Sequence, residues 1–371
     1  MKLAVLDING CRARAVAGPD GSVPQALALD GTRPELATII RLNGRRPEVG
    51  QAAVDMCRQY PHLTEADFLP RLGRDQFPPS HHGAISPERA IALVVARLRE
   101  PLSGYDHLSL CLPGYLSESQ ATQCRAAFAK TRLRILGAVP SAVALAMAGR
   151  GGGEDLALVT VLVDNHGLAF GHVEAGEHGL RLAEEHVATA LGMNAWWEAL
   201  LNGIAEICIR QNRRDFRDSG AAEQGIFGQL DDVVSAASRG ELIEIVIRTR
   251  HWCQNLILRP DQINAMCEPL ARRAARVFAE WLQQKVPARP CRIVLGDEAA
   301  SRPGLKTAIQ DANKSMEVIE MSTTKALCRL HAQASQWLGA DPGRIWSCLP
   351  PAAAPARSNN ERPHSLRIRW R

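Results

Sequence analysis

Two six-residue stretches, VLDING at residues 5–10 and LVDNHG at residues 162–167, decide how the chain is expected to fold. Each is a short apolar strand that ends in an aspartate, and a glycine three residues later allows a tight turn into the next strand. Glycine lets backbone amides approach a phosphate, and an aspartate beside them can orient a hydrated cation. Because one such hairpin stands at the start of each half, the repeat favours a duplicated, two-lobed clamp around a nucleotide.

The composition is that of a globular protein rather than a disordered one, because 46% of the 371 residues are hydrophobic and 22% are charged. The net charge of +5 is concentrated in residues 350–371, which hold five arginines and one glutamate. The rest of the chain is close to neutral and only 5% of the residues are aromatic, so we expect no specific nucleic-acid partner. The arginines of this last segment are expected to give only weak attraction to anionic surfaces.

The ten cysteines indicate a reducing compartment. No two of them form a C-x-x-C pair, which argues against a zinc ribbon and against a thioredoxin-type site. The chain shows no signal peptide, and no apolar run approaches the ~18 residues of a membrane-spanning helix. We therefore expect a cytoplasmic protein with no membrane span.

The sequence GGGED at residues 151–155 is the clearest internal boundary, because three successive glycines favour a loop over a helix or a strand. Ser86 and Ser117, each followed by an acidic residue and an apolar pattern, are expected to cap helices. The expected parts are lobe I at residues 1–150 with a small subdomain at about 37–90, lobe II at residues 155–340 with a helical subdomain at about 195–285, and a disordered, Arg-rich tail at residues 349–371.

Short fragments along the chain occur in an order that resembles one protein family. They are VGQAA at residues 49–53, ISPE at 85–88, LPGYLSESQ at 112–120, PSAVALA at 140–146, LGD at 295–297 and SRP at 301–303. Through these fragments, and over roughly residues 3–340, the chain resembles the nucleotide-binding domain of the seventy-kilodalton heat-shock protein (DnaK-type) chaperones. No single fragment is decisive, but their order and spacing together make the resemblance strong.

The resemblance implies an α/β fold of the actin-like ATPase type, in which two lobes enclose a central cleft that holds ATP or ADP with Mg²⁺. In such a cleft Asp7 and Asp164 would hold the metal ion through water. The family's peptide-binding domain is expected to be absent, because only a short tail follows the region of resemblance. The resemblance places the nucleotide-binding positions at Asp7, Asn9, Gly10, Asp164, Gly167, Gly296 and Asp297.

The chain departs from the family at the positions that perform phosphoryl chemistry. The first loop lacks both hydroxyls of the family pattern D-L-G-T-T, and the second loop keeps one of three glycines. Val139 stands where the family has a glutamate, and no lysine lies between Lys2 and Lys130 to contact the transferred phosphate. Arg71 is the candidate for a cation on the phosphate side, and the alternative is a purely structural role, because arginine does not replace lysine conservatively.

The apolar strands and helix starts resemble the family, whereas the residues that would touch a nucleotide mostly do not. We therefore expect a pseudo-ATPase, a degenerate nucleotide-binding-domain homologue that acts through protein partners or clients. The alternative is a working, ATP-binding, chaperone-like ATPase that uses Asp7, Asp164 and Arg71. A sugar kinase of the same superfold is least favoured, because no carboxylate stands out as the base for an acceptor hydroxyl.

Overall fold

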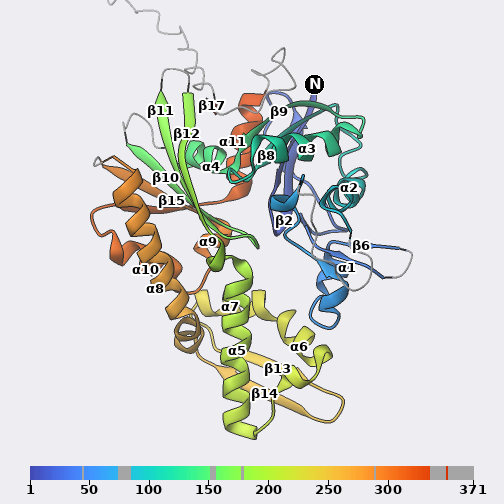
Figure 1. Ribbon diagram of the computed structural model, residues 1–371, viewed down its shortest axis with the longest axis vertical. Coiled ribbons are helices and arrows are strands. Elements are labelled where there is room, and N and C mark those ends of the chain that lie inside the picture. Colours follow the sequence, from blue (N-terminus) through green and yellow to red (C-terminus); the bar gives the residue numbers. More distant parts are fainter. Residues whose placement is uncertain are drawn as a thin grey trace, which may run out of the picture.

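Two six-stranded sheets dominate the architecture, and two helices lie between them (Figure 1). The computed structural model describes residues 1–43, 46–73, 85–150, 156–176, 179–287, 290–334 and 348–349. The expectation of a mixed α/β fold is confirmed. The expected boundary at residues 151–155 lies outside the described residues.

The first sheet is built around β1, which is buried over almost its whole length because both of its faces are apolar. It pairs antiparallel with β2 and parallel with β8. The strand order is β3-β2-β1-β8-β9, and β4 pairs with β2. The strands are β1 (Lys2–Ile8), β2 (Arg12–Pro19), β3 (Gln25–Ala26), β4 (Glu35–Ala37), β8 (His107–Leu112) and β9 (Arg134–Pro140).

The second sheet repeats this plan around β10, which pairs antiparallel with β11 and parallel with β15. Its order is β16-β15-β10-β11-β12-β17. In both sheets an Asp–Gly turn therefore joins the central strand to its antiparallel neighbour, as the sequence repeat predicts. The strands are β10 (Ala157–Val163), β11 (Leu168–Gly176), β12 (Gly179–Ala188), β15 (Cys291–Gly296), β16 (Glu317–Met321) and β17 (Cys348–Leu349).

The helices between the sheets are α4 (Ser141–Gly149) and α11 (Thr323–Ala334). Residues 142–149 of α4 are all buried, as expected for a helix that is apolar all round. One core cluster contains Val5 of β1, Val143 of α4, Leu158 of β10 and Leu330 of α11. The two sheets therefore share a core through these helices.

Two of the helices that pack near the first sheet begin as their capping residues predict. The Ser86 hydroxyl accepts a hydrogen bond from the Arg89 amide at 3.2 Å. The Ser117 side chain accepts from the Gln120 amide at 3.3 Å, and the Gln120 side chain accepts from the Ser117 amide at 2.9 Å. These two helices are α2 (Pro87–Leu98) and α3 (Glu118–Ala129). Beside the second sheet lie α8 (Pro260–Lys285), α9 (Asp297–Ala300) and α10 (Leu305–Ala312).

Two smaller units extend from the sheets. One contains β5 (Ile40–Arg41), β6 (Glu48–Val49), β7 (Thr64–Glu65), α1 (Gln51–Val54), η1 (Pro61–Leu63) and η2 (Leu69–Arg71). The other, at the bottom of Figure 1, contains η3 (Thr189–Leu191), α5 (Met193–Asn212), η4 (Phe216–Asp218), α6 (Gly220–Phe227), α7 (Leu230–Ser238), β13 (Ile243–Arg248) and β14 (Cys253–Leu258). The sequence predicts one strand near residues 242–247 but misses β14, in which polar Gln254 and Asn255 interrupt the apolar residues.

The expectation of a disordered tail is wrong at its first residue. Leu349 lies with Cys348 in β17, which pairs antiparallel with Leu180 and Arg181 of β12. The outer edge of β12 offers free backbone donors and acceptors, and a short strand can satisfy them. Residues 350–371, together with their expected contact to anionic surfaces, lie outside the described residues. None of the described helices is long and apolar enough to cross a membrane.

We expect Ser117→Ala to lower the free energy of unfolding by about 1 kcal/mol, because the change removes an N-terminal helix cap. Urea denaturation followed by circular dichroism measures this effect. Ser119→Ala is the matched control, because Ser119 is exposed on the same helix and its hydroxyl makes no hydrogen bond to the described residues. Equal losses in the two variants would contradict the assignment of the cap.

Candidate functional site

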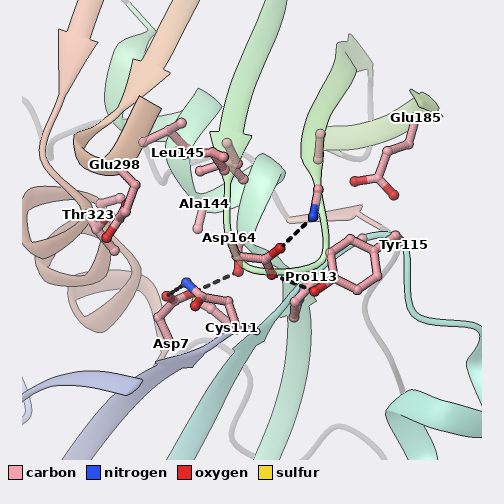
Figure 2. Close-up of a pocket in the computed structure, with 18 of the residues that line it drawn as sticks. Asp7, Cys111, Pro113, Tyr115, Ala144, Leu145, Asp164, Glu185, Glu298 and Thr323 are labelled. Atoms are coloured by element: carbon pink, nitrogen blue, oxygen red, sulfur yellow. Dashed lines mark hydrogen bonds between the residues drawn. The ribbon is translucent and has the colours of Figure 1, made fainter. Parts of the chain in front are cut away.

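A cavity lies between the two sheets where β1 and β10 end (Figure 2). Side chains of α4, among them Ala144 and Leu145, form part of its apolar wall. None of the described residues that line it is a lysine, an arginine or a histidine. The carboxylic acids that line it are Asp7, Asp164, Glu185 and Glu298.

The carboxylate of Asp164 joins three segments of the chain. Its Oδ2 accepts a hydrogen bond from the Gly10 amide at 2.9 Å. The same oxygen accepts one from the Tyr115 hydroxyl at 2.5 Å (Figure 2). Its Oδ1 accepts from the amides of His166 at 2.9 Å and Gly167 at 3.2 Å. Burial raises the pKa of Asp164, and the hydrogen bonds from Tyr115, Gly10 and Gly167 oppose that rise.

The two Asp–Gly turns contact each other directly. Besides the bond from Gly10 to Asp164, the Asn165 side-chain amide donates to the Gly10 carbonyl at 2.9 Å. Gly10 permits this close packing, because a Cβ there would lie 2.9 Å from the Asp164 Oδ2 atom. The sequence predicts that the Gly10 and Gly167 amides face a phosphate, but in this arrangement both donate to Asp164.

Asp7 is 3% exposed and accepts a hydrogen bond from the Ser141 hydroxyl at 2.6 Å. Burial raises its pKa to about 6, and the Ser141 hydrogen bond opposes the rise. Asn9 serves its own turn, because its Oδ1 accepts from the amides of Cys11 and Arg12 at 3.0 Å each. The structure thus brings Asp7, Asn9 and Asp164 to one cavity, as the sequence predicts.

Ion pairs cross from β2 to α9 beside the cavity. Arg14 lies 2.7 Å from the Glu298 carboxylate and 3.2 Å from that of Asp297. Arg12 and Arg14 both pair with Glu35, at 2.5 and 2.6 Å. Although burial alone would raise the pKa of Glu35, the two guanidinium groups lower it below its ordinary value.

The remaining residues predicted for the nucleotide site have other contacts. Asp297 accepts a hydrogen bond from the Thr323 amide at 2.9 Å besides pairing with Arg14. Gly296 does not line the cavity, and a Cβ there would lie 2.8 Å from the Leu162 side chain of β10. Its small size therefore serves packing between strands β15 and β10.

Arg71 lies outside the group of residues that line the cavity. Its guanidinium pairs with Glu65 and donates to the carbonyls of Ala66 at 2.9 Å and Asp67 at 3.1 Å. These contacts tie η2 to the segment after β7. They favour the structural alternative for Arg71 over the phosphate-side cation.

Arg302, in the SRP fragment, is a second cation whose side chain does not line the cavity. It is 5% exposed, stacks on the Trp197 ring with 4.3 Å from the guanidinium carbon to the ring centroid, and donates to the Glu298 carbonyl at 3.1 Å. Burial lowers its pKa to about 10. Its side chain is thus used to hold α5 and α9 together.

Sequence reasoning missed Tyr115, Ser141 and Glu185 as parts of the site. Tyr115 and Ser141 lie inside fragments that carry the family resemblance, but nothing in those fragments signals bonds to Asp164 and Asp7. Glu185 stands in β12 without any motif around it, and only the fold brings it to the cavity. Burial raises the pKa of Glu185 to about 7, and the nearby charge of Asp164 adds to that rise.

Within the part of the chain that the structure describes, no group of three or more His, Cys, Asp or Glu side chains is arranged to hold a metal ion. The residues present also fit a nucleotide's phosphates poorly, because basic side chains are lacking at the cavity and the Gly10 and Gly167 amides already bond Asp164. The sequence matches no protein-family model and no curated protein.

We expect Tyr115→Phe to lower the free energy of unfolding by about 1.5–3 kcal/mol, because it removes a hydrogen bond to a buried carboxylate. Denaturant titration measures the change. Tyr105→Phe is the control, since the Tyr105 ring is partly buried but its hydroxyl makes no hydrogen bond to the described residues. A loss below ~0.5 kcal/mol for Tyr115→Phe, the range of neutral substitutions, would contradict the importance of this bond.

We expect the titration of Asp7 to lower the free energy of unfolding as the pH rises through the acidic range. Its pKa is about 6 in the folded protein against an ordinary 3.8, so the folded state holds this proton more tightly than the unfolded state. The resulting stabilisation is fully present below pH 3.8 and is lost as the pH rises to about 6. Asp7→Asn removes the titration and keeps an oxygen for Ser141.

In urea denaturation between these pH values, the free energy of unfolding of Asp7→Asn should therefore fall less, or rise more, with increasing pH than that of the wild type. The difference in slope is expected to approach ~1.4 kcal/mol per pH unit. Asp20→Asn, a change at an exposed carboxylate, should retain the wild-type slope. Parallel curves for Asp7→Asn and the wild type would show that Asp7 titrates normally.

Proposed function

We propose that the chain is a degenerate homologue of the nucleotide-binding domain of seventy-kilodalton heat-shock chaperones, with the actin-like two-lobed fold. It does not turn over ATP, and it acts by binding protein partners. The six ordered sequence fragments and the matching strand plans of the two sheets support this family and fold. Nine of the ten cysteines are free thiols, which supports a reducing, cytoplasmic location.

The observation that carries the proposal is the charge of the cavity. Four carboxylic acids line it and no described lysine, arginine or histidine does. A triphosphate brings several negative charges, and at contact distances like charges repel strongly where water is excluded. Catalysis of phosphoryl transfer needs positive charge aimed at the transferring group, and this cavity lacks it.

The hydrogen bonds to Asp164 and the ion pairs of β2 support the same proposal. Amides that would bind phosphate donate to Asp164, and Arg12 and Arg14 of β2 pair with carboxylates. A nucleotide would have to displace these internal partners before it gained its own. The scaffold is thus suited to holding one closed shape for partners to recognise.

A working ATPase stays the second candidate, because Asp7 and Asp164 line the same cavity, as they would in a nucleotide site. In that case the Asp164 side chain would have to release Gly10 on binding. The free energy for this release would come from the nucleotide and its metal ion.

A thermal-shift titration with ATP and ADP, each with and without Mg²⁺, separates the two candidates. The proposal predicts no shift at millimolar nucleotide, whereas a ligand at a hundredfold excess over its dissociation constant adds roughly 2.7 kcal/mol of stability. Asp7→Ala and Asp164→Ala are run beside the wild type. A Mg²⁺-dependent shift that both substitutions abolish would establish a nucleotide site and overturn the proposal.

A further inference from the structure

A group of arginines gathers at the end of the molecule farthest from the sheets, at the bottom of Figure 1, where α5 ends near the β13–β14 hairpin. The Arg214 guanidinium lies over the Trp252 ring at 5.5 Å, and the Cys208 thiol contacts the Gln254 side chain at 3.4 Å. These contacts join the last turn of α5 to the hairpin turn. We call the exposed set the arginine end: Arg210, Arg213, Arg214, Arg248 and Arg250.

Among the described residues, the arginine end carries more positive charges than it has ion-pair partners. Residues 209–218 and 248–253 contain six arginines and two aspartates. Asp215 is taken by the sixth arginine, Arg217, at 2.6 Å. Within the described residues none of the five arginines of the arginine end forms an ion pair, whereas exposed Arg239 and Arg259 each pair with a neighbouring carboxylate.

Arg213 is held in an unfavourable backbone conformation. It ends α5 with φ of 55° and ψ of 34°, the left-handed region, where glycine or asparagine costs less. Only one other described non-glycine residue, Asp67, has a positive φ. A strained residue that keeps a charged side chain at an exposed position points to a use for that charge.

We propose that the arginine end is the docking surface for an acidic segment of a partner protein. This inference rests on the proposed function, which requires a protein partner, and it supplies that partner's chemistry. Guanidinium groups bind carboxylates through two parallel hydrogen bonds. Five exposed arginines that form no ion pair to the described residues suit a run of aspartate and glutamate side chains.

The surroundings favour an acidic peptide over a nucleic-acid strand. Single strands need open aromatic rings for base stacking, but Trp252 is half-buried and Arg214 covers its ring. A phosphate backbone also follows an unbroken positive groove, whereas Glu206 and Asp218 are exposed beside these arginines. A short peptide can place its carboxylates between such interruptions.

The test uses the full chain and a short fluorescein-labelled peptide of alternating aspartate and glutamate, followed by fluorescence anisotropy. The double variant Arg248→Glu, Arg250→Glu should bind the peptide roughly tenfold or more weakly. The control is Arg273→Glu, Arg276→Glu on α8, which changes the net charge equally at two exposed arginines that form no ion pair to the described residues. It should bind within about twofold of the wild type.

A second variant keeps the test valid if the hairpin changes misfold. Arg213→Gly removes one of the charges and relieves the left-handed strain, so it should melt at a higher temperature and still bind the peptide more weakly. Equal losses in both double variants, no measurable binding by the wild type, or stronger binding to a single-stranded oligonucleotide would each overturn the proposal. Nucleotide-induced stabilisation would reject the pseudo-ATPase reading without altering the peptide result.

Discussion

The arrangement of the cavity depends on the carboxylate of Asp164. Four hydrogen bonds reach it from the first Asp–Gly turn, from Tyr115 after β8, and from its own turn. A buried carboxylate without such donors would cost several kcal/mol, so the donors and the carboxylate hold each other in place. The relative position of the two sheets is therefore set by a polar contact as well as by the apolar packing of α4 and α11.

Opposite charges are separated along the molecule. At the centre, carboxylic acids gather around the cavity, and Arg12 and Arg14 of β2 pair with acids. At the far end, the five arginines have no such partners in the described part of the chain. The arginines beside the cavity are thus neutralised by carboxylates and help to hold the fold. The arginine end is exposed and available for contact with a partner protein.

Much of the fold could be predicted from the sequence, because strands such as β1 are apolar throughout and the helix caps at Ser86 and Ser117 act locally. The grouping of Asp7 and Asp164 also followed, since each ends the central strand of its sheet. The bonds from Tyr115 and Ser141 and the position of Glu185 could not be predicted, because they depend on side chains far apart in sequence meeting across the sheets. The start of β17 was missed because its pairing depends on the free edge of β12 rather than on its own composition.

The ion pairs between β2 and α9 also shape the response of the molecule to temperature. Charged groups lose hydration free energy as water warms, so the penalty for keeping Arg14 and Glu298 mostly out of solvent shrinks, while the gain per unit of buried apolar area levels off. The contact between β2 and α9 therefore weakens less on heating than a purely apolar contact of the same area.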